Sequence, residues 1–270
     1  MTVTLRDDSL SDLRRRMFAP TTSAAPTADV QPLLGYTVRI NDGPNFYMLC
    51  KDIFRNRIYH FDSPREDPFI LDCGGNIGMS VLYFKHVYPK ARIITFEPDP
   101  AVLPCLRENV ERNDLSDVTI VEAAIGGRSG SRVLCCDGKY DSALTDYSPS
   151  HSGGDPPPAT PRIAVDCVRL RDYLTEPVDF LKVNIEGAET EVLADSEDRL
   201  RRVAAMAIEY HHLPGLRRTL PQILALLDRR GFDYLVYDYD AETNPRCQPP
   251  FRLDADTRYY LLIHARRRDA

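Results

Sequence analysis

The feature that most constrains the fold is a glycine-rich run placed between a strand and a helix. Phe69-Ile70-Leu71 is an unbroken apolar run that predicts a buried strand, and residues 77–87 have the pattern of a helix. Asp72-Cys73-Gly74-Gly75-Asn76-Ile77-Gly78 connects the two. Glycines let the backbone turn tightly and approach a ligand closely, and the helix start offers free N–H groups. Because ligands of open α/β sheets bind at such strand ends, the run predicts a ligand-binding turn.

Strand and helix patterns alternate along most of the chain after Asp67. Further strands are predicted at 92–96, 118–123, 179–185 and 203–209. The intervening helices are predicted at about 99–113, 188–194 and 216–230. Two late strands, 234–237 and 258–265, have no long helix between them, which favours an antiparallel pair at a sheet edge. The pattern predicts an α/β fold with a mostly parallel sheet that is covered on both faces.

Two segments interrupt this alternation. Residues 1–32 are expected to form a mobile N-terminal arm with a short helix at 9–18, because the stretch after it is rich in Pro, Thr and Ala. Residues 33–66 are expected to form an N-terminal hairpin or cap, with its turn at Asn41-Asp42-Gly43-Pro44. The main domain then covers residues 67–270, with an inserted β segment at about 126–168. Within the insertion, a stretch rich in Gly and Pro at 151–161 predicts a surface loop.

Composition narrows the class of partner. A chain of 270 residues is long enough for one large domain with a sizeable core, and its formal net charge of −6 disfavours nucleic acid as a partner. We see no signal peptide and no apolar stretch long enough to span a membrane. With seven cysteines, an odd number, we expect free thiols in a reducing cytoplasm. No Cys/His cluster has the spacing of metal ligands, so we expect no metal site.

Glu97 indicates which kind of ligand the turn binds. It ends the strand that follows Asp72 and can accept hydrogen bonds from both hydroxyls of a ribose, so an adenosine-containing ligand is predicted. A dinucleotide site needs G-x-G-x-x-G, whereas this chain has Gly74-x-Asn76-x-Gly78. Asp72 would repel a pyrophosphate but suits a cationic amino-acid group. S-adenosylmethionine therefore fits the motif better than NAD.

Polar residues also follow two later strands. Asn184 and Glu186 end the strand at 179–185 and point the same way if that strand is regular, so Glu186 would face the same crevice as Asp72. Glu209-Tyr210-His211-His212 ends the next strand, and His211 is a second candidate for a general base near neutral pH. An acid at a helix start such as Glu186 can also serve only as a cap.

At these motifs the chain resembles the FkbM family of S-adenosylmethionine-dependent methyltransferases, over roughly residues 66–240. The resemblance rests on the runs 71–78, 96–98, 108–109, 123–126 and 182–189. It implies a class I methyltransferase fold, which is Rossmann-like with a mostly parallel seven-stranded sheet and an antiparallel edge strand. It also implies S-adenosyl-L-methionine as cofactor and, most often, O-methylation of a natural product or glycan.

The resemblance assigns candidate site residues. The cofactor-binding set is Asp72, Gly74, Gly75, Asn76 and Gly78 around the methionine part, Glu97 and Pro98 at the ribose, Glu122, Ala123 and Ala124 along the adenine, and Asn184. The family commonly has Asp where this chain has Asn184, which puts a base or metal role at that position in doubt. Glu186 is then the better-placed catalytic acid, with His211 as the second catalytic candidate.

The predicted activity is transfer of a methyl group to a hydroxyl on a small natural product or sugar. Two alternatives stay open. One is N-methylation of an amide, amine or peptide, and the other is a non-catalytic nucleotide-binding protein. The sequence indicates a small-molecule acceptor as partner but gives no oligomeric state.

Overall fold

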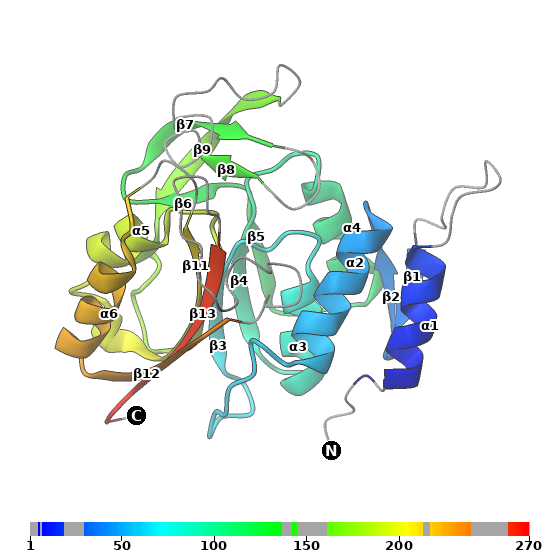
Figure 1. Cartoon of the computed structure of the whole chain (residues 1–270), viewed down its shortest axis with the longest axis horizontal. Helices are drawn as coiled ribbons and strands as arrows, with labels where there is room; N and C mark the ends of the chain where they lie inside the picture. The colour runs from blue at the N-terminus through cyan, green and yellow to red at the C-terminus, as the bar shows by residue number, and fades with distance from the viewer. Residues whose placement is uncertain are drawn as a thin grey trace, which may run out of the picture.

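The molecule is built on a seven-stranded central sheet (Figure 1). The computed structural model describes residues 5, 7–18, 30–136, 142–144, 161–212, 217–238 and 259–269. The strand order is β12-β13-β11-β10-β3-β4-β5. The strands are β3 (Phe69–Cys73), β4 (Arg92–Phe96), β5 (Val118–Val121), β10 (Val178–Val183), β11 (Val203–His212), β12 (Phe232–Tyr237) and β13 (Tyr259–Arg267). Five neighbouring strands, β11 to β5 in this order, are parallel, which confirms the predicted α/β fold.

Helices cover both faces of this sheet because the side chains of each central strand alternate between two apolar cores. Ile70 of β3 packs in the core on the side of α3 (Met79–Val87) and α4 (Leu103–Arg112). Its neighbour Leu71 packs in the core on the side of α5 (Glu189–Asp195) and α6 (Leu220–Arg229). Figure 1 shows the two helix layers on opposite sides of the strands. Both faces are therefore apolar, and the unbroken hydrophobic run of β3 follows from its central position.

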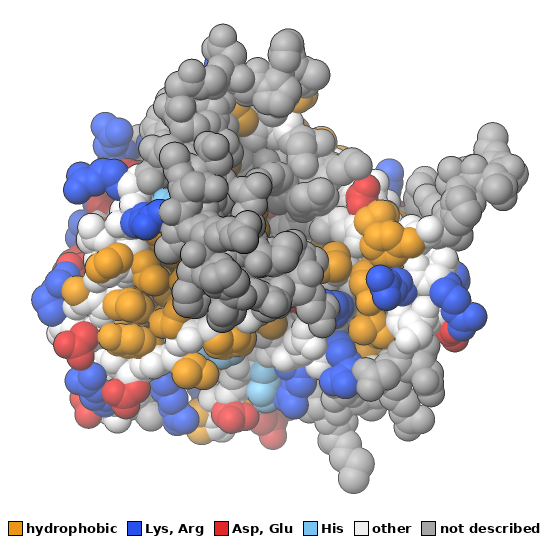
Figure 2. Space-filling view, viewed as in Figure 1, with side chains coloured by type: hydrophobic (Ala, Val, Ile, Leu, Met, Phe, Trp, Pro, Cys, Tyr) orange, Lys and Arg blue, Asp and Glu red, His pale blue; other side chains and the backbone are white. Residues whose placement is uncertain are grey.

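The two late strands form an antiparallel pair at the sheet edge, as predicted, and the reversed strand of this pair lies one position in from the edge. β13 is antiparallel to both of its neighbours, β11 and β12, and β12 forms the edge. Leu262 and Ile263 of β13 have no exposed surface, which suits a strand covered on both sides. In β12, by contrast, Tyr234 and Leu235 are 40% and 64% exposed. Figure 2 shows hydrophobic side chains gathered over α6 and β12 on this face.

The N-terminal hairpin turns earlier in the sequence than predicted. β1 (Val30–Leu33) pairs with β2 (Tyr36–Arg39) across Leu34 and Gly35, whose φ angles of 49° and 93° suit a tight hairpin turn. The segment 41–44, predicted as the turn, instead starts the helix α2 (Gly43–Leu49). Asp42 caps this helix by accepting a 2.8 Å hydrogen bond from the backbone N–H of Asn45. The π-helical segment η1 (Cys50–Arg55) follows directly.

The first described helix is packed on the domain, which differs from the expectation of a mobile arm over residues 1–32. In α1 (Asp7–Met17), the side chains of Leu13 and Met17 are 4% and 7% exposed and belong to the same core as Phe46 of α2. The amphipathic pattern of α1 explains this, since one apolar face must be covered. The stretch 19–29 lies outside the described residues, so the structure does not test whether it is mobile.

The inserted β segment predicted at about 126–168 pairs with β6 (Ala124–Gly126) in a second, four-stranded sheet, which the sequence pattern did not predict. Its order is β6-β9-β7-β8. The strands are β6 (Ala124–Gly126), β7 (Gly130–Cys135), β8 (Ala143–Leu144) and β9 (Arg162–Arg169). The predicted loop at 151–161 lies outside the described residues except for its last residue. Two single turns, η4 (Leu170–Asp172) and η5 (Leu200–Arg202), complete the structure. Among the described helices, none has the length and apolar character needed to cross a membrane.

Candidate active site

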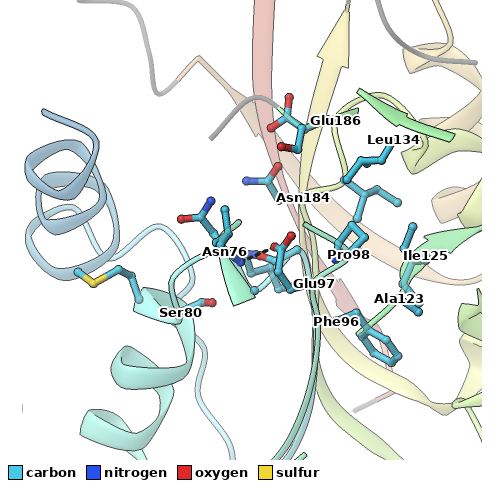
Figure 3. Close-up of a pocket in the computed structure, with 18 of the residues that line it drawn as sticks. Asn76, Ser80, Phe96, Glu97, Pro98, Ala123, Ile125, Leu134, Asn184 and Glu186 are labelled. Carbon is cyan, nitrogen blue, oxygen red and sulfur yellow. Dashed lines mark hydrogen bonds between the residues drawn. The ribbon is translucent and has the colours of Figure 1, made fainter. Parts of the chain in front are cut away.

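A pocket opens at the carboxyl ends of β3, β4 and β10, and the space in and above it, open solvent included, is about 920 Å³. Nine of the sequence-predicted residues line it: Gly74, Gly75, Asn76, Glu97, Pro98, Ala123, Ala124, Asn184 and Glu186. In Figure 3, Glu186 and Asn184 lie at one end of the labelled set and Phe96 and Ala123 at the other, with Glu97 between them. Parallel strands bring residues from distant parts of the sequence to this one edge.

The glycine turn is fixed by its contacts with the neighbouring strands. The backbone N–H groups of Gly74 and Gly75 both donate to the carbonyl of Phe96, at 3.0 and 2.8 Å. A Cβ at Gly74, whose φ is 93°, would lie 1.9 Å from the carbonyl oxygen of Asn184. A Cβ at Gly75 would lie 2.3 Å from the hydroxyl of Thr95. These positions therefore need glycine because β4 and β10 approach the turn closely, whatever ligand binds above it.

Asp72 does not reach the pocket, contrary to the prediction that it contacts the methionine part of the cofactor. Its side chain is fully buried, and one carboxylate oxygen lies 3.0 Å from Nζ of Lys182. The other oxygen accepts hydrogen bonds from the hydroxyls of Ser80 (2.7 Å) and Thr95 (3.0 Å). Lys182 in turn donates to the carbonyl of Gly74 at 2.6 Å. Asp72 thus holds the turn from below through Lys182.

Two other predicted cofactor residues also lie outside the pocket lining. Gly78 caps α3, and a Cβ there would lie 2.9 Å from a methyl carbon of Leu106, so this glycine serves helix packing. Glu122 is half exposed and forms an ion pair with Arg107. Its neighbours Ala123 and Ala124 do line the pocket, so their predicted place along the adenine stays a prediction, whereas Glu122 itself lies outside the lining.

Glu97 is a buried acid with its carboxylate already oriented by the backbone. One oxygen accepts from the N–H of Asn76 at 2.7 Å and the other from the N–H of Asp99 at 2.9 Å. Burial raises the pKa of Glu97 to about 7, and the nearby charge of Asp99 acts in the same direction, whereas the two N–H donors oppose the shift. A carboxylate titrating near neutral pH at the centre of the pocket gives the site a measurable pH dependence.

Glu186 lies at the pocket beside a buried histidine and a second acid. Oε1 of Glu186 lies 3.4 Å from Nε2 of His211, and Nδ1 of His211 lies 2.9 Å from Oε1 of Glu189. Glu189 also accepts the backbone N–H of Gly187 at 3.0 Å. Glu186 has a φ of 52°, a left-handed backbone that is costly for a residue with a side chain. The acid that ties the loop backbone is therefore Glu189, while Glu186 faces the pocket.

His211 does not line the pocket, and its charge argues against the predicted role as a base. Burial lowers the pKa of His211, but the carboxylates of Glu186, Glu189 and Glu209 together raise it to about 10. An imidazole with this pKa holds its proton at neutral pH and cannot accept another. His211 therefore acts as a buried cation between two acids.

Sequence reasoning missed the contribution of the N-terminal segment to the pocket. Asn45 and Leu49 of α2, Ile53 of η1 and Tyr59 all line it, as does Lys182 of β10. The second sheet adds Leu134 and Leu144, and Ser142 lies directly before β8. Asn45, Leu49 and Ile53 are spaced four residues apart, which is typical of one face of a helix. The prediction of a hairpin over this stretch did not use that spacing. Tyr59 donates a hydrogen bond to Glu209 and is also hydrogen-bonded by the side chain of Asn184.

The fold and the pocket define a class of enzyme. A glycine turn after β3, an acid after β4 and one reversed strand beside the far edge of a seven-stranded sheet are the architecture of a class I methyltransferase. Residues 72–234 match the family model described as the methyltransferase FkbM domain. The chain belongs to this family of methyltransferases. The methyl donor that the class implies is S-adenosylmethionine.

Relatives found by sequence similarity also carry methyltransferase names. Methyltransferase 1 of Beauveria bassiana (strain ARSEF 2860) is 33% identical over 233 residues, which cover 80% of this chain and 88% of the relative. Methyltransferase sdnD of Sordaria araneosa is 31% identical over 218 residues, 68% of this chain and 81% of the relative. The 2-O-methyltransferase NoeI of Sinorhizobium fredii (strain NBRC 101917 / NGR234) is 29% identical over 177 residues, 61% of this chain and 71% of the relative.

The residues of the pocket suit S-adenosylmethionine. Oδ1 of Asn184 is buried and has no hydrogen-bond partner within the described part of the chain, so it can accept from an ammonium group. Glu97 can accept from ribose hydroxyls. Phe96, Ala123 and Ile125 give the far end of the pocket an apolar surface that suits an adenine ring.

The pKa of Glu97 leads to a prediction about cofactor affinity. We expect ribose hydroxyls to donate to Glu97, and an ionised carboxylate accepts two hydrogen bonds more strongly than the protonated acid, so binding should favour Glu97 without its proton. Because the pKa is raised to about 7, the affinity for S-adenosylhomocysteine should be constant above that pH and fall about tenfold for each pH unit below it. Calorimetric titration from about pH 5 to about pH 8 measures this slope. Glu97→Gln should bind more weakly and lose the slope; a slope kept in that variant would contradict the assignment to Glu97.

Proposed function

We propose that this chain catalyses S-adenosylmethionine-dependent O-methylation of a hydroxyl on a small natural product or sugar, with Glu186 as the general base. The observation that carries the proposal is the placement of Glu186. Its carboxylate lines the pocket at the end opposite the apolar surface that suits an adenine ring. It is also paired with the cation of His211. Glu189 accepts the N–H groups of Ile185 and Gly187, which supports Glu189 as the acid that holds this loop.

A carboxylate at this place suits a hydroxyl acceptor. The cofactor supplies an electrophilic methyl group on a sulfonium, which already has a good leaving group. An unassisted hydroxyl is a weak nucleophile at neutral pH, so a positioned base assists its attack, whereas a neutral amine needs no base to attack. Glu186 can accept the hydroxyl proton because its side chain is part of the pocket lining. The printed activity of NoeI, a relative, is a 2-O-methylation, which also favours oxygen over nitrogen.

The role proposed for His211 is to position Glu186. The imidazolium is held on its Nδ1 side by Glu189 and by the backbone carbonyl of Glu209 at 2.9 Å. Its Nε2 side is then directed to Glu186. A buried cation at this distance keeps the Glu186 carboxylate in one orientation and offsets the cost of a charge in a partly dry site.

A binding and transfer experiment tests the proposed function. Purified protein should be stabilised against heat by S-adenosylhomocysteine and not by NAD, because the turn lacks the dinucleotide glycine pattern. Methyl transfer from labelled S-adenosylmethionine should then be measured on matched acceptors that differ only in a hydroxyl or an amine. We expect product from the hydroxyl series. Stabilisation by NAD alone, or product from amines alone, would contradict the proposal.

A further inference from the structure

The end of the pocket formed by the N-terminal helices holds a polar group that the proposed reaction does not use. Asn45 and Leu49 lie one turn apart on α2, and Ile53 follows on η1. Asn45 is 8% exposed, and its Nδ2 atom is buried without a hydrogen-bond partner among the described residues. Leaving a buried amide donor without an acceptor costs free energy, so such a group in a pocket points to a ligand atom that completes it.

The glycine turn and the neighbouring strand ends offer few open donors to a ligand. Their donors already have acceptors in the protein. The donors that already have an acceptor are the backbone N–H groups of Gly74, Gly75 and Asn76 and the side chains of Tyr59, Ser80, Ser142 and Lys182. A ligand carboxylate at this side of the pocket must therefore find its donor elsewhere, and Asn45 lies on the same lining.

The charges of the pocket also direct a carboxylate toward α2. Glu97 and Glu186 repel a ligand carboxylate, and the lining residues contributed by α2 and η1 carry no acid. Another buried polar atom on the lining, Oδ1 of Asn184, also has no partner among the described residues; it is an acceptor and suits an ammonium group. An open donor at Asn45 and an open acceptor at Asn184 in the same pocket suit the carboxylate and the ammonium of an amino-acid zwitterion.

We infer that Nδ2 of Asn45 donates a hydrogen bond to the carboxylate of the methionine part of S-adenosylmethionine. The inference rests on the proposed use of this cofactor, and it assigns to α2 a direct role in cofactor binding. The helix α2 would then bind the methionine carboxylate, a group that other adenosine-containing ligands lack, in addition to covering the pocket.

Ligands that differ at this end test the inference by calorimetry. Asn45→Ala should weaken S-adenosylhomocysteine by about tenfold to 100-fold, the range for a hydrogen bond to a charged group. Decarboxylated S-adenosylmethionine and 5′-methylthioadenosine lack the carboxylate, so both should bind Asn45→Ala as they bind the unchanged protein. Asn45→Asp keeps the size of the side chain but places a negative charge beside the carboxylate, and should weaken S-adenosylhomocysteine further. Asn56→Ala, an exposed asparagine outside the lining, is the matched control.

The outcomes separate this inference from the proposed function. If the unchanged protein binds none of the three ligands, the proposed function is wrong. If it binds them and Asn45→Ala binds S-adenosylhomocysteine equally well, the inference is wrong and the function stands. Equal weakening of all three ligands would show that Asn45 only shapes the pocket, and this would also overturn the inference. An increase in acceptor KM with unchanged S-adenosylhomocysteine affinity would assign Asn45 to the acceptor instead. Retained binding of 5′-methylthioadenosine shows that each variant is folded.

Discussion

Glu186→Gln is expected to lower turnover by about 10²–10⁴-fold at saturating cofactor and acceptor, because it removes the proposed general base. The glutamine keeps the size of the side chain but cannot accept the hydroxyl proton. The substitution should leave Glu97 in place, since the backbone N–H groups of Asn76 and Asp99 hold that carboxylate, whereas Glu186 is paired with His211. The affinity for S-adenosylhomocysteine should therefore stay within about twofold. Steady-state rates and calorimetry on the same preparation measure the two quantities.

A matched control separates loss of the base from loss of charge near the loop. Glu191→Gln removes a carboxylate from the first turn of α5 that is not among the lining residues, and it should keep nearly full turnover. If Glu186→Gln also keeps nearly full turnover, alignment of the two substrates alone carries the reaction, and the assisted mechanism is wrong. If cofactor affinity falls in parallel with turnover, Glu186 is part of the cofactor site rather than the base.

The sequence predicts the central sheet well because apolar strands and amphipathic helices have distinct periods. The strand predicted at 92–96 coincides with β4, and the others agree within a few residues at each end. The N-terminal segment fails for a different reason. Asn-Asp-Gly-Pro is as suitable for a helix start as for a turn, since Asp caps helices and Pro is accepted in a first turn. Only the packing of Phe46 and Ile53 in the core decides between them.

The site was predictable where strand ends alone determine position. Glu97, Asn184 and Glu186 follow parallel strands, and any parallel order of these strands brings them to one edge. Asp72 was not predictable because its environment depends on which strand lies beside β3. The register of β10 on β3 places Lys182 directly opposite Asp72, and this pairing turns a candidate ligand contact into a buried ion pair. Local sequence does not show strand order or register.

The ion pair beneath the turn gives the largest expected effect on stability. Lys182→Met should lower the free energy of unfolding by about 3–5 kcal/mol, because it leaves the fully buried carboxylate of Asp72 without its cation. Methionine fills a similar volume, so little of this loss comes from a cavity. The carbonyl of Gly74 also loses its donor, so the affinity for S-adenosylhomocysteine should fall as well. Urea unfolding followed by circular dichroism measures the first quantity and calorimetry the second.

A double variant tests whether the loss belongs to the pair or to Lys182 alone. Asp72→Asn combined with Lys182→Met removes both charges, and an amide at position 72 can still interact with Ser80 and Thr95. It should be more stable than Lys182→Met, since no buried charge is left unpaired. Lys90→Met, at an exposed lysine paired with Glu66, should change stability by less than about 0.5 kcal/mol. If Lys182→Met is as mild as Lys90→Met, or if the double variant is the least stable of the set, the pair does not support the turn. In that case the hydrogen bonds from the hydroxyls of Ser80 and Thr95 to the Asp72 carboxylate hold the glycine turn in place without Lys182.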